Sequence, residues 1–138
     1  MAERDPAVLL RLITEEIWNR RRYELVDELI SEDFVDHVEM PGLEGIGRAR
    51  YLASVEFNHA AYSDYHEEIE FIVADDAKAV SYVRVTGTHD GDLMGLPPTG
   101  RKVDIHAMGA LRFSHGQVVE RWGVCDSLTQ MQQLGLLG

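Results

Sequence analysis

The sequence predicts a single α+β domain, with three N-terminal helices packed on one face of a strongly curved antiparallel sheet. Apolar residues recur at helical spacing in the first half of the chain, and the second half is rich in strand-forming residues separated by turns. Helices followed by a run of strands are typical of this class. The 138 residues, 45% of them hydrophobic, suffice for one core and are too few for two. We therefore expect one domain over residues 1–138.

Three helices are predicted in the first half. Asp5 followed by Pro6 is a favourable helix start, and apolar residues then recur at helical spacing as far as Ile17. A short second helix is predicted over residues 23–30, and a third over about residues 48–62. The segment DFVDHVEMPGLEGIG between them predicts a turn-rich connection.

Four strands are predicted in the second half, in two hairpins. Residues 67–73 and 79–88 are rich in β-formers and flank an acidic turn. Residues 102–113 and 117–126 flank His115 and Gly116, a connection whose glycine suits a tight turn.

The register of the second hairpin places one carboxylate on an apolar face. When residues are counted outward from the turn, Gly109 is paired with Trp122 and Ile105 with Asp126. We expect these side chains to point to the concave side of the sheet, which the helices cover. The opposite face is too apolar for solvent, which predicts a homodimer through the outer face of the sheet. That face carries His106, Met108, Ala110, Val119, Gly123 and Cys125, with Asp104, Arg112 and Arg121 among them.

Asp126 has two interpretations. It could cap a C-terminal helix, because SLTQMQQLG is helical in pattern and begins directly after it. However, Ser127 and Gln130 form a capping box that would fill this role without Asp126. In the second interpretation the carboxylate faces an apolar pocket, which raises its pKa and suits it to act as a general base.

Charge and cysteine content limit the partners and the compartment. Acidic residues outnumber basic ones by 24 to 13, so the net charge of −11 argues against binding to nucleic acid or an anionic membrane. A hydrophobic small molecule is the expected ligand. Cys125 is the single cysteine, which excludes an internal disulfide and fits a reducing compartment. With no signal-peptide pattern at the N-terminus, we expect a cytoplasmic protein.

Three segments together resemble the SnoaL-like polyketide cyclases, within the nuclear-transport-factor-like superfamily. They are FVDHVEMPGLEG, GTHDGDLMGLPPTGRKV and RFSHGQVVERWGVCDSLTQMQQLG. The resemblance implies a cone-shaped fold with a hydrophobic pocket between helices and sheet. It also implies cofactor-independent chemistry, most simply an intramolecular aldol cyclisation of a polyketide-like molecule. In cyclases of this family an aspartate on the last strand is the general base, and Asp126 resembles that position.

A second catalytic group must come from another element, because the residues opposite Asp126 are apolar. Histidines are the candidates, with His37, His59 and His89 ahead of His106, which points the other way in this register. No local ligand spacing predicts a metal site. The candidate ligand-binding residues are Trp122, Trp18, Tyr62, Met40, Met94 and Gly109.

Two further classes of function remain open. The first is an isomerase, dehydratase or epoxide hydrolase of the same fold, since the superfamily hosts several chemistries. The second is a non-catalytic, small-molecule-binding dimer, in which no rate would depend on Asp126.

Overall fold

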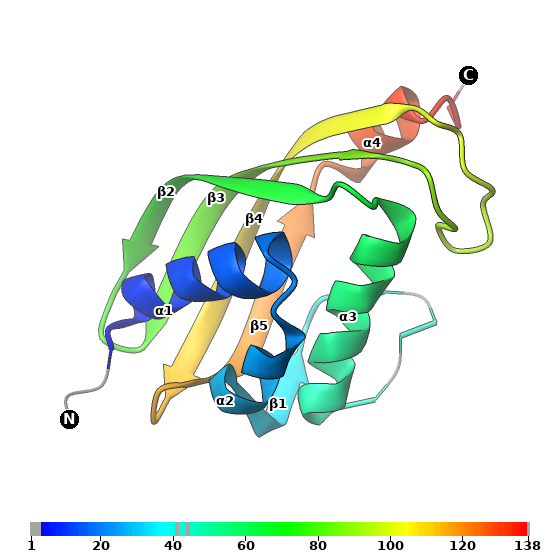
Figure 1. Cartoon of the computed structure of the whole chain (residues 1–138). Coiled ribbons are helices and arrows are strands. Elements are labelled where there is room, and N and C mark those ends of the chain that lie inside the picture. The colour runs from blue at the N-terminus through cyan, green and yellow to red at the C-terminus, as the bar shows by residue number, and fades with distance from the viewer. Residues whose placement is uncertain (1–3, 41, 44, 138) are drawn as a thin grey trace.

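The computed structural model describes residues 4–40, 42–43 and 45–137. A curved five-stranded sheet has helices lying across one face (Figure 1). This confirms the predicted α+β class. The strands, in the spatial order β1-β5-β4-β3-β2, are β1 (Ile30–Asp36), β5 (Gln117–Cys125), β4 (Lys102–Ser114), β3 (Lys78–Thr88) and β2 (His66–Ala74).

The helices follow the predicted pattern, with one unusual segment. Asp5 caps α1 (Pro6–Leu12) by accepting a hydrogen bond from the Val8 N–H, as its sequence predicts. The helix then widens into a π-helical turn, η1 (Ile13–Asn19), a geometry that is rare and often found at functional sites. The remaining helical elements are η2 (Tyr23–Leu25), α2 (Val26–Leu29), α3 (Gly47–Ala61) and α4 (Ser127–Gln133).

Strand β1 was missed by the sequence interpretation, which placed most of it in a turn-rich connection. It pairs parallel to β5, so the sheet is mixed, whereas the other three pairings are antiparallel. The segment is acidic and only Ile30 and Phe34 are fully buried, so its period-two signal is weak.

A β-bulge changes the register of the second hairpin. Phe113 pairs with Val118 as predicted, but Arg112 pairs with Glu120, so Val119 is the extra residue. Beyond the bulge the pairing is shifted by one, and Gly109 faces Gly123 instead of Trp122. The predicted register was therefore wrong beyond the bulge, and every later side chain of β5 is on the opposite face.

Two apolar clusters form the core, one at each end of the concave face. The larger packs α1, η1 and α3 against the turn end of β4 and β5, with Ile17, Phe34 and Val55 fully buried. The smaller surrounds Ile105 and Leu134, the residue that ends α4. Between them the sheet carries small residues, and this leaves space for a cavity.

Candidate active site

A cavity of about 410 Å³ lies between the concave face of the sheet and the helices η1 and α3. Gly109 and Gly123 face each other across β4 and β5 at its floor, next to Ala107 and Ser81. Two smaller spaces share walls with it, one of about 130 Å³ towards α1 and one of about 110 Å³ towards the second core cluster. Small side chains in the centre of the sheet therefore create the hollow.

Glu67, on β2, places a carboxyl group in the cavity wall. Its backbone is held at both ends by Asn19, the last residue of η1, which accepts from the Glu67 N–H (2.8 Å) and donates to its C=O (2.9 Å). The Tyr65 hydroxyl donates to Glu67 Oε2 at 2.9 Å. Burial raises the pKa of Glu67 to about 7, although the Tyr65 hydrogen bond and the charge of Arg121 act against the rise. A carboxyl group with this pKa can both take up and release a proton near neutral pH.

Arg121, on β5, lines both the central cavity and the space towards α1. Asp36 of β1 binds its Nε (3.1 Å) and its Nη2, and Nη2 also donates to Ser54 Oγ (3.1 Å). Arg50 lies against the same carboxylate, with its Nη2 at 3.4 Å from Asp36 Oδ2. Within the described part of the chain these bonds use Nε and Nη2 of Arg121, which leaves Nη1 to donate to a ligand.

Tyr51 and Trp18 line the space towards α1 beside Arg121, and Trp18 also lines the central cavity. The guanidinium carbon of Arg121 lies 4.9 Å from the centroid of the Tyr51 ring, and the Trp18 indole N–H donates to the Tyr51 hydroxyl at 2.9 Å. Burial raises the pKa of Tyr51 to about 12. The hydroxyl therefore keeps its proton and is a second hydrogen-bond donor beside the guanidinium.

The geometry agrees with the comparisons to known proteins. The model of the SnoaL-like polyketide cyclase family matches residues 8–134. The chain belongs to this family. The comparison with curated proteins found no match.

Solved structures of similar sequence share the fold of this SnoaL-like chain. IdmH from Streptomyces antibioticus, a candidate polyketide cyclase, is 27% identical, with 96% of this chain and 99% of IdmH covered and a TM-score of 0.81. AclR from Streptomyces galilaeus, a candidate hydroxylase, is 30% identical, with 97% and 89% covered and a TM-score of 0.79. TsrD from Streptomyces laurentii is 21% identical, with 98% and 100% covered and a TM-score of 0.85, and shows the fold alone.

The structure brings several of the predicted ligand-binding residues of this SnoaL-like chain to the cavity. Trp18, Met40, Gly109 and Trp122 line the central space, and Tyr62 lines the extension of about 110 Å³. Met94 does not lie with them: it is 56% exposed in the loop between β3 and β4.

Asp126 is placed differently from the catalytic prediction. The register shift turns it away from the concave face, and it is the exposed N-cap of α4, accepting from the Thr129 N–H (3.1 Å) and hydroxyl (2.6 Å). These bonds hold the pKa of Asp126 below its usual range, the opposite of what a general base at neutral pH needs. The capping interpretation is therefore correct. Trp122 borders the cavity but pairs with Ala110 after the register shift, and its indole stacks on His37, with ring centroids 5.0 Å apart.

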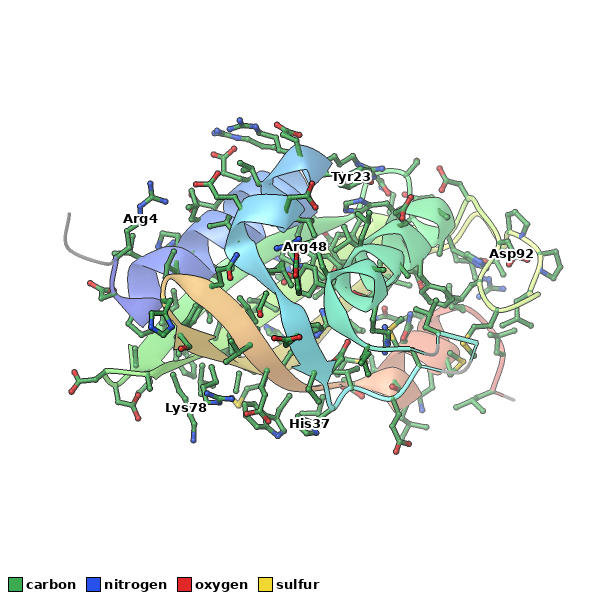
Figure 2. The ribbon with its side chains drawn as sticks, turned by 90° about the horizontal axis from the view of Figure 1, so that it is seen from below. Arg4, Tyr23, His37, Arg48, Lys78 and Asp92 are labelled. Carbon is green, nitrogen blue, oxygen red and sulfur yellow. The ribbon has the colours of Figure 1, made fainter. Side chains whose placement is uncertain are left out.

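The candidate histidines His37, His59 and His89 are not among the described residues that line the central cavity. His59 links η1 to η2, because its Nε2 donates to the Trp18 carbonyl (2.8 Å) and its Nδ1 lies 2.5 Å from the Tyr23 hydroxyl. Burial lowers the pKa of His59 and so disfavours its charged form. His89 is fully buried at the end of β3 and bonds Thr99. His37 projects from the side of the sheet away from the helices (Figure 2), where it binds Glu120 at 2.8 Å.

The sequence interpretation missed Glu67, Arg121 and Asp36. Glu67 is two residues before the inward-facing Ile69 on the same strand, so the two side chains point to the same face of the sheet. This spacing is the signal that could have placed Glu67 on the concave face. Arg121 was assigned to the outer face because the bulge was not foreseen, and Asp36 lay in the supposed connection. Among the described residues no group of three or more His, Cys, Asp or Glu side chains is arranged to hold a metal ion. In the same residues no helix is long and apolar enough to cross a membrane.

Replacing Asp126 with alanine is expected to lower stability by about 1 kcal/mol, because α4 loses its cap. This corresponds to a fall in Tm of about 4 °C for a domain of this size. Asp126→Asn, which can still accept the capping bonds, should melt close to the wild type. Neither change should reduce turnover in the assay described below. A large loss of turnover in Asp126→Asn with unchanged folding would restore Asp126 as a catalytic residue.

Proposed function

We propose that this chain catalyses an intramolecular aldol cyclisation, or closely related acid–base chemistry, on a polyketide-like hydrophobic small molecule, with Glu67 as the general base. The observation that carries the proposal is a carboxyl group with a pKa of about 7 in the wall of a cavity that also contains a buried guanidinium. Membership of the SnoaL-like family supports the substrate class. The net charge of −11 favours a ligand that is not strongly anionic.

In the proposed reaction the Glu67 carboxylate removes a proton from a carbon between two carbonyl groups. The resulting enolate carbon attacks a second carbonyl carbon of the same molecule, a C–C bond forms, and the carbonyl π electrons move to its oxygen. Arg121 Nη1 and the Tyr51 hydroxyl would donate hydrogen bonds to this oxygen as its negative charge develops, and so act as an oxyanion hole. Other hydrogen bonds already hold both side chains in place before the substrate arrives. Glu67 then returns its proton to the alkoxide, so the product is an isomer of the substrate.

Proton exchange at the activated carbon of a simple β-diketone tests the first step without knowledge of the natural substrate. Acetylacetone is incubated with the protein in D₂O, and loss of its central C–H signal is followed by NMR. We expect exchange above the buffer rate, rising in proportion to protein concentration. Exchange at the buffer rate in both the wild type and the variants would contradict the proposed function and favour a binding role.

Filling the cavity at Gly109 is expected to abolish this exchange while the fold is kept. A Cβ at Gly109 would meet only the Trp122 carbonyl oxygen, at 3.6 Å, an ordinary contact. The rest of a leucine side chain in Gly109→Leu would then enter the cavity and displace the ligand. Circular dichroism and Tm check the fold, and unchanged exchange in a folded Gly109→Leu variant would place the reaction elsewhere.

We also propose that a second copy of the chain covers the convex face of the sheet. Phe71, Val73, Met108 and Val124 are between 40% and 75% exposed there. Apolar surface gathered on one sheet face is typical of a protein interface. Aromatic pairs, Tyr82 with His106 and His37 with Trp122, lie among these residues.

Met108→Lys is expected to convert this homodimer to a monomer, because it places a charge at the centre of the covered face. Met94→Lys is the matched control, since Met94 is also exposed but lies in a loop. Light scattering coupled to size exclusion measures both masses. A wild type that is monomeric at high concentration, or a dimeric Met108→Lys, would contradict the proposed interface.

A further inference from the structure

An apolar extension of about 110 Å³ opens off the central cavity beneath the second core cluster. It shares Asn58, Ala107 and Cys125 with the central cavity, so the two spaces adjoin each other. The other walls are mainly apolar and aromatic, and include Val85, Val103, Ile105, Tyr62 and Tyr65.

Three of the polar side chains that border the extension are already paired within the protein. The Tyr62 hydroxyl accepts from Gln130 Nε2 at 2.7 Å, and the Tyr65 hydroxyl donates to Glu67 at 2.9 Å. Asn58 Nδ2 donates to a backbone carbonyl one helical turn earlier, at 2.9 Å. A ligand in this space therefore meets mostly hydrocarbon, and burial of its own apolar surface is the main source of affinity.

The extension also has a fixed position relative to the proposed reaction centre. Tyr65 lies between the two, because its ring borders the extension and its hydroxyl binds the Glu67 carboxylate. A molecule whose reacting carbon lies at Glu67 can therefore extend along the central cavity, past Ala107, into the extension.

We propose that this extension is a subsite for a short unbranched alkyl end of the substrate. The inference rests on the proposed function, in which the dicarbonyl end of the same molecule lies at Glu67. A volume of about 110 Å³ holds about four methylene groups at the packing density of a protein interior. Ala107 controls the passage between the spaces, and Ile105 and Val103 limit the length of chain that fits.

A homologous series of ligands tests the subsite. Linear β-diketones, beginning with acetylacetone and lengthened at one end by one methylene at a time, are titrated into the full-length protein by calorimetry. For the wild type, the Kd should fall about fourfold per methylene over about four consecutive homologues and then level off. Ala107→Leu should remove this fall, because its side chain obstructs the passage.

Ile105→Ala should extend the fall in Kd by about two further homologues, because it enlarges the subsite and the neighbouring side chains relax only in part. Leu93→Ala is the matched control: Leu93 belongs to the same core cluster and does not border the extension. This variant should lose stability but keep the wild-type dependence on chain length. A Kd independent of chain length, or the same limit in Ile105→Ala and Leu93→Ala, would overturn the subsite.

Deuterium exchange measured in the same samples separates this inference from the proposed function. The predicted chain-length profile without catalysed exchange would refute Glu67 as a base and leave the alkyl subsite standing. Catalysed exchange with no chain-length profile would refute the subsite alone. A homologue ending in a phenyl ring that binds more tightly than the alkyl chain of equal carbon number would replace the alkyl assignment with an aromatic one.

Discussion

Replacing Glu67 with glutamine is expected to reduce catalysed proton exchange by about 10²- to 10⁴-fold, the usual contribution of a positioned general base. Glutamine has nearly the same shape, and its side-chain oxygen can still accept from the Tyr65 hydroxyl, which donates to Glu67 in the wild type. The fold should therefore be kept, and the loss should appear in kcat because glutamine cannot take up the proton. Exchange rates by NMR, with Tm as a check on folding, measure the effect.

Glu68→Gln is the matched control, because Glu68 follows on the same strand but is exposed on the other face. The same loss of charge at this position should leave exchange unchanged. Equal losses of exchange rate in both variants would show that the rate depends on the negative charge of the strand and not on a base in the cavity. Full activity in Glu67→Gln would remove Glu67 from the mechanism.

The pH dependence of the rate and of stability should both report Glu67. The rate should rise with pH through about 7, as the carboxyl group releases its proton and becomes a base. Because the folded pKa lies above the ordinary value of 4.5, the folded chain holds a proton between these pH values that the unfolded chain has released. Stability from this group is thus present below pH 4.5 and is lost as pH rises through about 7. Glu67→Gln should lack this loss.

Apart from β1, the order of the main helices and strands was predictable from sequence, but the face presented by β5 was not. The helix start at Asp5, the third helix and both hairpins carry local signals, and these elements lie within a few residues of their predicted positions. The bulge at Val119 has no local signal in the sequence RFSHGQVVERWG, in which a hairpin without a bulge fits as well. Period-two patterns make this error consequential, because one extra residue exchanges the two faces.

The candidate site was predictable only in its lining. Trp18 and Gly109 are placed by elements whose pattern is strong, and both reach the cavity. Its charged groups depend on pairings distant in sequence: Asp36 meets Arg121 only because β1 lies parallel to β5. The same bulge that moved Asp126 outward moved Arg121 inward, so one local irregularity decides which charged side chain the cavity contains.

Replacing Asp36 with asparagine is expected to destabilise the fold by about 3–5 kcal/mol, because it removes the anion from a buried cluster and leaves two guanidinium groups without a counter-charge. The Asp36 side chain is 1% exposed, and those of its partners Arg50 and Arg121 are 4% and 12% exposed. Chemical denaturation gives the free energy of unfolding.

Asp104→Asn provides the contrast, because Asp104 pairs with Arg84 on the exposed face, where both side chains are nearly half exposed. Such a pair contributes about 0–1 kcal/mol, so this variant should unfold close to the wild type. Similar losses in the two variants would show that burial does not determine the strength of the Asp36 cluster.

A triple variant, Asp36→Leu with Arg50→Met and Arg121→Met, separates stability from function. Buried ion clusters replaced by apolar residues of similar size often leave proteins as stable as before, because no charge then needs to be desolvated. We therefore expect the triple variant to recover most of the stability that Asp36→Asn loses, but to remain inactive in proton exchange, because the Arg121 donor is gone. Recovery of both would mean that the cluster serves folding alone, and that the oxyanion is held by other groups. Recovery of stability without activity would mean that the chain keeps a costly buried charge because the reaction needs it.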